Sequence, residues 1–318
     1  MKKIIAVCLM LTVLLTGALA GCKSENPGPS AGNRLSIVTT IFPICDWVRQ
    51  IAGEHADVTI LLDNGVDLHS YQPTAQDIIK LTSADLFLYI GGESDKWVQD
   101  ALKEAPDKLA TMNLMETLGD AIKEEEVVEG MEAEEEAAQA DEGPEYDEHI
   151  WLSLKNAAVL CRAICDRLCA IDSANAADYR ANAQGYLTKL NALDAAYQAA
   201  VDASQVKTLL FGDRFPFRYL TEDYGLDYYA AFVGCSAESE ASFQTIAFLA
   251  QKVDELGLHA ILQIETSDGS IANTIRATTA TKDQKILTMN SLQGASGENA
   301  SYLSVMQENL DVLKEALA

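Results

Sequence analysis

The hydrophobic positions of this chain follow two different spacings in turn along most of its length. Short runs of β-branched and other apolar residues, such as 58–62 and 85–90, are typical of buried strands. Between them lie stretches with apolar residues every three or four positions, which is typical of helices that bury one face. Thr74 is a predicted N-cap, with Asp77 three residues later in the first turn. Strands are predicted over 35–42, 58–62, 85–90, 207–211, 227–233, 259–264 and 285–289, and helices over 74–82, 94–102, 153–170, 173–203, 215–224, 241–256, 270–277 and 300–317.

This alternation of strands and helices predicts parallel α/β sheets. The helical stretch 173–203 is unusually long and rich in Ala, with tyrosines and leucines near one face. A helix of about 30 residues extends about 45 Å, which is enough to cross from one lobe to another. The predicted fold class is therefore α/β, with two lobes, each a mostly parallel sheet with flanking helices, joined by one long rigid helix. The predicted boundaries are 35–170 for the N-terminal lobe, 171–204 for the linking helix and 205–318 for the C-terminal lobe.

The first residues indicate export from the cytoplasm. Two lysines precede an apolar run at 4–15, which is too short to span a bilayer comfortably but suits a signal peptide. The tetrapeptide Leu19-Ala20-Gly21-Cys22 resembles a bacterial lipobox, so we predict a signal peptide over 1–21 and a lipid on Cys22. The alternative is an ordinary secretory signal with a chance Cys. The Ser-, Gly- and Pro-containing segment 22–34 is typical of a tether.

The net charge of −25 argues against a nucleic-acid partner, because phosphates would be repelled. Thirteen acidic residues and no basic residue fall within 124–148. Such a sequence buries little apolar surface, so 119–148 is predicted to be a mobile acidic loop. Its role stays open between a low-affinity antenna for cations and a solvated insertion.

Five cysteines follow Cys22. Three of them, Cys161, Cys165 and Cys169, are spaced four residues apart and share one stripe of a predicted helix. Their sulfurs would spread along about 12 Å, too far for one tetrahedral ion, so buried apolar roles are favoured. A disulfide between Cys45 and one of these three is left open, as is the state of Cys235.

The four histidines lie in different contexts. His69 follows the strand at 58–62 and so lies at the carboxyl end of a parallel strand, where open α/β sheets bind ligands. His149 directly follows the acidic stretch and precedes a helix. His55 and His259 lie at the far ends of their elements, and solvated roles are favoured for both. Imidazoles with nearby carboxylates form a ligand set for Zn²⁺ or Mn²⁺.

Four segments carry a resemblance to a known family. They are Val38-Thr-Thr-Ile-Phe-Pro43, Gly65-Val-Asp-Leu-His-Ser-Tyr-Gln-Pro-Thr74, Ala84-Asp-Leu-Phe-Leu-Tyr89 and Asp147-Glu-His-Ile-Trp-Leu-Ser-Leu-Lys-Asn156. The chain resembles the zinc- and manganese-binding lipoproteins of bacterial metal ABC importers. The resemblance implies two α/β lobes joined by a long helix, with a metal ion held between the lobes by two ligands from each. It implies that His69 and His149 are the ligands from the N-terminal lobe.

The C-terminal lobe departs from the family pattern. Alignment of the aromatic segment 211–219 places Arg214 at a ligand position, and a guanidinium cannot ligate a cation. We predict Asp213 as the substitute, with an N-cap role as the alternative. Asn290 stands where the family often has Asp, and Glu265, at the end of a strand, is predicted to be the fourth ligand instead.

The resemblance implies capture of a divalent metal ion, Zn²⁺ or alternatively Mn²⁺, and its delivery to the membrane permease of an ABC importer. We expect a monomer that is lipid-anchored at the outer face of the cell membrane and is not an enzyme. An adhesin, as proposed for relatives, is compatible with transport. A secreted metallohydrolase is disfavoured, because the sequence has neither a His-Glu-x-x-His motif nor a serine nucleophile elbow.

Overall fold

The computed structural model describes residues 34–62, 68–132, 145–236, 240–293 and 300–318. Leu35–Ala318 forms one compact unit. The predicted signal peptide and the predicted lipidation site, Cys22, lie outside the described residues. Within the described ranges, no helix is long and apolar enough to cross a membrane.

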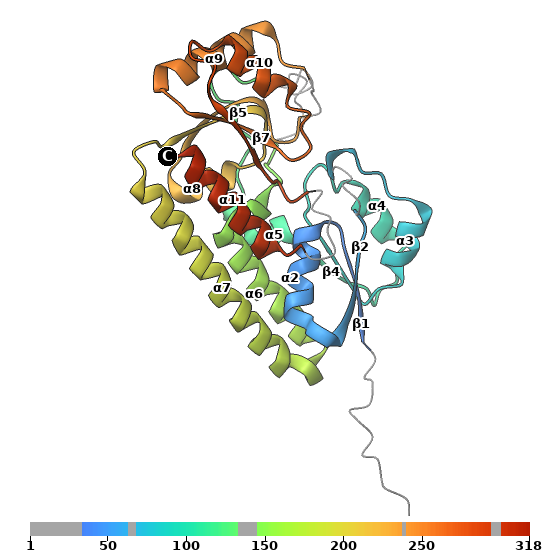
Figure 1. Cartoon of the computed structure of the whole chain (residues 1–318). Helices are drawn as coiled ribbons and strands as arrows, with labels where there is room; N and C mark the ends of the chain where they lie inside the picture. Colours follow the sequence, from blue (N-terminus) through green and yellow to red (C-terminus); the bar gives the residue numbers. More distant parts are fainter. Residues whose placement is uncertain (1–33, 63–67, 133–144, 237–239, 294–299) are drawn as a thin grey trace, which may run out of the picture. The chain divides into compact units, whose positions relative to one another are not determined.

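The N-terminal lobe is built on a four-stranded sheet with the order β2-β1-β3-β4 (Figure 1). All its neighbouring strands are parallel, so their carboxyl ends meet at one edge of the sheet. The strands are β1 (Leu35–Thr39), β2 (Ala56–Ile60), β3 (Leu86–Tyr89) and β4 (Ala110–Asn113), and the helices are α2 (Phe42–Ala52), α3 (Ala75–Thr82), α4 (Trp97–Lys103) and α5 (Leu114–Leu118).

The C-terminal lobe repeats this architecture with the strand order β6-β5-β7-β8, again all parallel. Helices α9 and α10 cover one face of this sheet, and α8 and α11 contact the other. The strands are β5 (Thr208–Phe215), β6 (Asp227–Val233), β7 (Ala260–Ile264) and β8 (Lys285–Met289), and the helices are α8 (Arg218–Tyr224), α9 (Phe243–Leu256), α10 (Ser270–Thr278) and α11 (Tyr302–Ala316).

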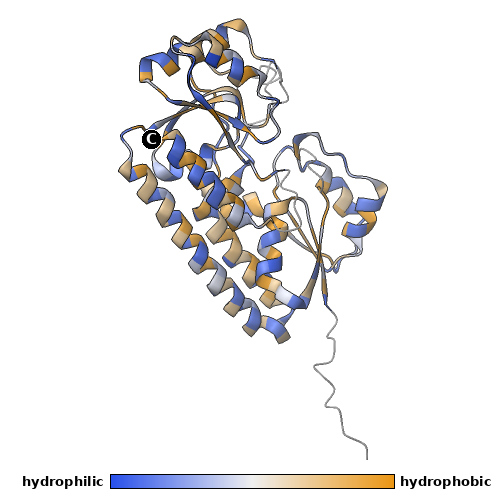
Figure 2. Cartoon of the chain, viewed as in Figure 1, coloured by the Kyte–Doolittle hydropathy of each residue, from blue (hydrophilic) through white to orange (hydrophobic). Residues whose placement is uncertain are grey.

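Two long helices connect the lobes. Helix α6 (Leu154–Ile171) packs along α7 (Ala176–Ala203), and α7 also contacts α2 and α11. Hydrophobic and hydrophilic stretches alternate along both helices in Figure 2, as expected for helices with one buried face. A continuous cluster of buried apolar side chains extends through both lobes, and a second one lies beneath α9 and α10. The two sheets are therefore connected by one continuous apolar core.

The predicted fold class is confirmed, and the predicted capping box at Thr74 and Asp77 is present. Three elements were not predicted, namely α2, β4 and α5. The described parts of the acidic stretch, for which a mobile loop is predicted, make contacts with both lobes. Met131 is buried, and Glu132 pairs with Phe232 of the C-terminal lobe. At the other end, Glu124 forms an antiparallel bridge with Tyr146. Gly130 also packs against Phe248 of α9, so the part of the stretch around Met131 lies on the second lobe.

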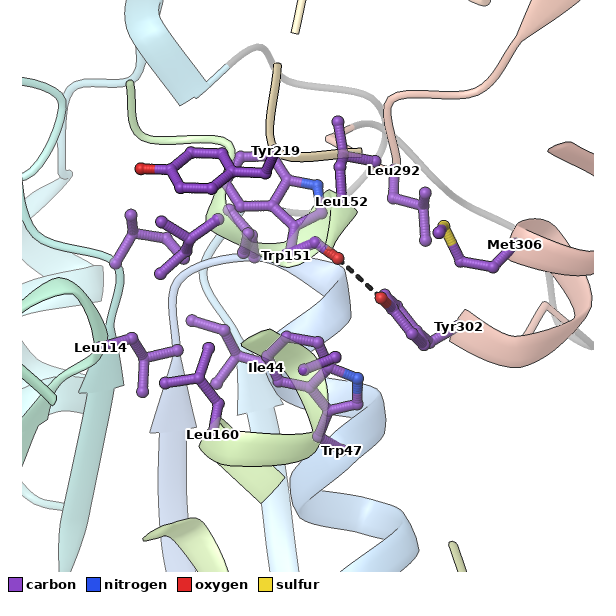
Figure 3. Packing of buried hydrophobic residues seen from close by; sticks show 14 of the residues in the cluster. Ile44, Trp47, Leu114, Trp151, Leu152, Leu160, Tyr219, Leu292, Tyr302 and Met306 are labelled. Carbon is purple, nitrogen blue, oxygen red and sulfur yellow. Dashed lines mark hydrogen bonds between the residues drawn. The ribbon is translucent and has the colours of Figure 1, made fainter. Parts of the chain in front are cut away.

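A buried hydrogen bond connects the start of α11 to the loop before α6. The Tyr302 hydroxyl donates to the carbonyl of Trp151 at 2.6 Å, and both side chains are fully buried (Figure 3). The indole of Trp151 donates in turn to the carbonyl of Ser291 at 2.8 Å. The loop that follows His149 is thereby fastened to the loop that follows β8.

We predict that Tyr302→Phe lowers the free energy of unfolding by about 1–3 kcal/mol, because it leaves the buried Trp151 carbonyl without its donor while the ring packing is kept. Urea unfolding followed by circular dichroism measures this change. Tyr146→Phe, at a tyrosine that is 39% exposed, serves as the control and should change stability by about 0.5 kcal/mol or less. Equal effects of the two substitutions would contradict the prediction.

Candidate metal site

Two histidines from different parts of the N-terminal lobe meet at the carboxyl edge of its sheet. His69 belongs to the 3₁₀ turn Leu68–Ser70, beyond β2, and His149 precedes the turn Ile150–Leu152. Their Nε2 atoms are 3.3 Å apart. The His149 side chain is completely buried, whereas that of His69 is 13% exposed. The structure thus brings together the two predicted N-terminal ligands.

Neighbouring groups orient both rings. Asp147 Oδ1 accepts hydrogen bonds from the backbone N–H and from Nδ1 of His149, each at 2.8 Å. His69 Nδ1 lies 2.9 Å from Ser94 Oγ, and the Ser94 hydroxyl donates to Glu148. With Glu148 ionised, the proton of the His69 ring is therefore on Nδ1. Both Nε2 atoms then present lone pairs to the same point, which is how carboxylates orient metal-ligating imidazoles.

The Glu148 carboxylate lies on the Nδ1 side of His69, 3.5 Å from that nitrogen. Ser94 donates to it from both its backbone N–H and its hydroxyl. A Cβ at Gly92, whose φ is +78°, would stand 2.3 Å from Glu148 Oε1, so the close approach requires glycine. Burial raises the pKa of Glu148 to about 7 despite the hydrogen bonds from Ser94, which lower it. A cation at the histidines would favour the ionised form.

The C-terminal lobe contributes Cys235, which follows β6. One ligand atom from each of His69, His149 and Cys235 lies within 4.8 Å of the other two. Gly234 packs directly on the buried imidazole, since a Cβ there would stand 2.9 Å from His149 Cε1. Gln293, beyond β8, also reaches the histidines, with its Nε2 atom 2.7 Å from His149 Nε2 and 3.4 Å from His69 Nε2.

Asp213, predicted to be a ligand, lies at an irregularity of β5, where the pairing register with β6 shifts between Phe211 and Arg214. Its carboxylate accepts hydrogen bonds from the backbone N–H groups of Arg214 at 2.8 Å and Ile264 at 3.2 Å. The side chain thus supplies acceptors to backbone amides at this irregularity. Asp213 is not among the three clustered residues.

Glu265, the other predicted ligand, accepts from the backbone N–H of Ser291 at 2.7 Å and from its hydroxyl at 2.8 Å. The side chain of Asn290, the alternative ligand, accepts a hydrogen bond from Leu292 N–H. The backbone N–H of Asn290 donates to the side-chain oxygen of Asn309, and the Asn290 carbonyl accepts from the Asn309 side-chain amide. Both side chains fasten the loop after β8. Neither belongs to the His–His–Cys group, and the role of Asp213 and Glu265 as ligands stays a prediction.

The other histidines and cysteines lie away from this cluster. His55 Nε2 is 2.9 Å from Asp178, and His259 is exposed before β7. Cys45, Cys161 and Cys165 are buried, as the apolar interpretation expects, and Cys169 is partly buried. All described cysteines are free, so the structure contains no Cys45 disulfide.

A pocket of about 240 Å³ opens beside His69 and Cys235. Its wall includes both ends of the acidic stretch, because Glu125 N–H donates to the carbonyl of Glu145. One oxygen of Glu125 is buried without a hydrogen-bond partner. The lining residues are His69, Glu93, Ser94, Glu125, Glu145, Tyr146, Glu148 and Cys235.

Two nitrogens at about 2.0–2.1 Å from a tetrahedral Zn²⁺ are about 3.3–3.4 Å apart, which matches the 3.3 Å between the imidazoles. The pKa of Cys235 is raised well above its ordinary value by burial and by the charges of Asp147, Glu148 and Glu125. A thiolate at this position therefore needs a cation. The donor set of two imidazoles and one sulfur fits Zn²⁺.

Residues 37–316 match the family described as ZnuA, zinc-uptake complex component A, periplasmic. The chain belongs to this family. The family consists of binding components of transport systems, so the chain is not an enzyme. The chain is 32% identical to the zinc-binding lipoprotein AdcA of Streptococcus pneumoniae over 99% of its own length, but spans only 61% of that protein. It is 28% identical to the high-affinity zinc uptake system protein ZnuA of Bacillus subtilis, over 99% of this chain and 96% of the relative.

Solved structures agree with this assignment. Zn(II)-bound AdcA from Streptococcus pneumoniae superposes with a TM-score of 0.72 at 28% identity, over 90% of this chain and 58% of the other. The metal-dependent lipoprotein YcdH from Bacillus subtilis superposes at 0.73 and 27%, over 89% and 99% of the two chains. The two-lobed fold of this chain is therefore the fold of the family.

We predict that Glu148→Gln stabilises the metal-free protein more at pH 8 than at pH 5. Because the pKa of Glu148 is raised in the folded state, that state binds the carboxyl proton more tightly than the unfolded state does. The protonated Glu148 therefore contributes fully to stability below the ordinary pKa of 4.5, and this contribution is lost as pH rises through about 7. The gain over wild type should grow by on the order of 2–3 kcal/mol across this range. Urea unfolding of chelator-treated protein at both pH values measures it.

Ser94→Ala provides the matched comparison, because it removes a donor to the Glu148 carboxylate and should destabilise the protein more at pH 8 than at pH 5. A Glu148→Gln effect that is independent of pH would contradict the assigned burial of that charge.

Proposed function

We propose that this protein captures Zn²⁺ outside the cytoplasm and delivers it to the permease of an ABC importer, anchored by a lipid on Cys22. The observation that carries the proposal is that the Nε2 atoms of His69 and His149 lie 3.3 Å apart, with their lone pairs directed at the same point. Membership of the ZnuA family and the names of the zinc-binding relatives support it. The lipoprotein relatives support the anchor.

The donor types favour Zn²⁺ over Mn²⁺. Imidazole nitrogen suits Zn²⁺, and a nearby sulfur strengthens that preference, whereas Mn²⁺ prefers carboxylate and water oxygens. The carboxylates of Asp147 and Glu148 face the Nδ1 side of the histidines. They orient the rings and balance the charge of the ion, which suits reversible capture of a cation.

The acidic pocket beside His69 suits the approach of the ion. Four glutamates line it, Glu93, Glu125, Glu145 and Glu148. A cleft lined by one sign of charge concentrates counter-ions and speeds their association. An adhesin function finds support only in the shared fold, because the laminin-binding adhesin Lmb of Streptococcus agalactiae superposes at 22% identity.

We predict that His69→Ala and His149→Ala each weaken Zn²⁺ binding by at least about 100-fold, since even changes in groups that only orient a ligand cost 10–100-fold. Titration calorimetry with a competing chelator measures the dissociation constant. In the wild type, Zn²⁺ at a thousandfold excess over that constant should stabilise the fold by about 4 kcal/mol.

His55→Ala and His259→Ala are the matched controls, because both rings lie outside the cluster. They should bind Zn²⁺ within about threefold of the wild type. Equal affinity of all four variants, or a wild type whose melting temperature does not respond to Zn²⁺, would refute the proposed site.

A further inference from the structure

We propose that Cys235 supplies a thiolate ligand from the C-terminal lobe and that the side-chain amide oxygen of Gln293 completes the shell around Zn²⁺. This inference rests on the proposed function, because it concerns how the same ion is held. It replaces the carboxylate pair predicted from the sequence with one sulfur and one neutral oxygen. The site becomes His₂–Cys–Gln, with two ligands from each lobe.

Cys235 lies close enough to the two histidines to share an ion with them. The ligand atoms of His69, His149 and Cys235 all lie within 4.8 Å of one another. In a tetrahedral site with Zn–S of about 2.3 Å and Zn–N of about 2.0–2.1 Å, sulfur and nitrogen are about 3.6 Å apart. A movement of about one ångström by Cys235 therefore brings its sulfur to the distance of a ligand. The oxygens of Asp213 and Glu265 belong to no such group among the described residues.

The neighbouring residues hold Cys235 in place. Gly234 packs against the His149 ring, and a Cβ there would stand 2.9 Å from both His149 Cε1 and the carbonyl oxygen of Phe215, so a larger residue does not fit without displacement. Arg214 Nη1 donates to the carbonyl of Ser236 at 3.2 Å. The side chain that cannot itself ligate a cation thus fastens the residue next to Cys235. A hydrogen bond from Cys235 N–H to Glu125 fixes the other side.

Gln293 reaches the same two histidines from the loop after β8. Its amide group lies 2.7 Å from His149 Nε2, and rotation of the amide by 180° would place the oxygen there instead. The preceding residue, Leu292, is completely buried and has a φ of +60°, which a non-glycine residue adopts only when its surroundings impose it. The Asn290 side chain accepts from Leu292 N–H at 2.7 Å and holds this turn. The strained turn directs Gln293 at the histidines.

The two carboxylates then have a different role. Asp213 and Glu265 accept backbone N–H groups of Ile264 and Ser291, which border the ends of β7 and β8. They fix the loops that present the ligands. The thiolate has a consequence for selectivity, because soft sulfur favours Zn²⁺ over Mn²⁺.

X-ray absorption of wild-type protein loaded with one equivalent of Zn²⁺ tests the proposal directly. We expect one sulfur at about 2.3 Å and nitrogen or oxygen at about 2.0–2.1 Å. Cobalt-loaded protein should show a thiolate charge-transfer band in the near ultraviolet. Both signals should disappear in Cys235→Ser and persist in Cys169→Ser, whose sulfur lies on α6. A spectrum of bound Zn²⁺ without sulfur would overturn the inference and leave the proposed function standing. Failure to bind Zn²⁺ at all would overturn both.

Affinities of further variants separate ligands from positioning residues. Gln293→Ala should weaken Zn²⁺ binding at least about tenfold. Asp213→Asn and Glu265→Gln remove the charge but keep one of the two acceptor oxygens, and they should stay within about threefold. Cys235→Asp should reduce the preference for Zn²⁺ over Mn²⁺. Large losses in Asp213→Asn and Glu265→Gln with no loss in Cys235→Ser would restore the carboxylates as ligands and refute the Cys235 assignment.

Discussion

The arrangement of the site depends on how the buried His149 ring is held. Asp147 accepts a hydrogen bond from Nδ1–H, which leaves the lone pair of the ring on Nε2, where it faces Gln293 of the C-terminal lobe. The carbonyl of Asp147 accepts in turn from the Tyr219 hydroxyl of α8 at 2.8 Å. The orientation of one N-terminal imidazole is therefore fixed by a residue of the C-terminal lobe. Because ring and partner are both buried, an error in this orientation would leave polar groups unsatisfied, which is costly.

The buried contacts around Trp151, together with helices α6 and α7, keep the carboxyl edges of the two sheets at a fixed separation. Trp151 follows His149 directly and reaches Ser291 through its indole, while Tyr302 bonds the Trp151 carbonyl. A continuous apolar cluster connects these residues to α6 and α7. A frame of this kind resists a wide hinge opening, since many buried contacts would have to separate together. Movement needed to admit or release an ion is therefore expected at His69, Cys235 and Gln293, which lie beyond the ends of the strands and outside the two long helices.

Much of the fold could be predicted from the sequence because local chemistry agrees with global structure there. The β-branched runs form the strands, and Thr74 and Asp77 form the capping box that begins α3. The strand β4 was not predicted because Ala110–Asn113 is short and shows no clear alternation. Helix α2 was missed because its apolar start continues the run of β1, and only a proline near its first position marks the boundary.

Some residues of the site could likewise be predicted from the sequence, and others could not. His69 and His149 could be singled out because each follows a recognisable signal, a strand end or the acidic stretch. Cys235 and Gln293 have no metal-type spacing, and they reach the histidines only because parallel strands end at one edge. The rule applied to His69 would also have pointed to Cys235, which follows β6 directly. The choice of Asp213 as a ligand came from the family pattern, and in the structure its carboxylate accepts two backbone N–H groups at a strand irregularity.

The most direct test is a crystal structure of zinc-loaded protein with anomalous diffraction recorded on both sides of the zinc absorption edge. The account predicts a single strong peak about 2.0–2.1 Å from Nε2 of both His69 and His149, facing the C-terminal lobe. A peak confined to the acidic stretch, or one that lies between Asp213 and Glu265 away from the two imidazoles, would contradict it.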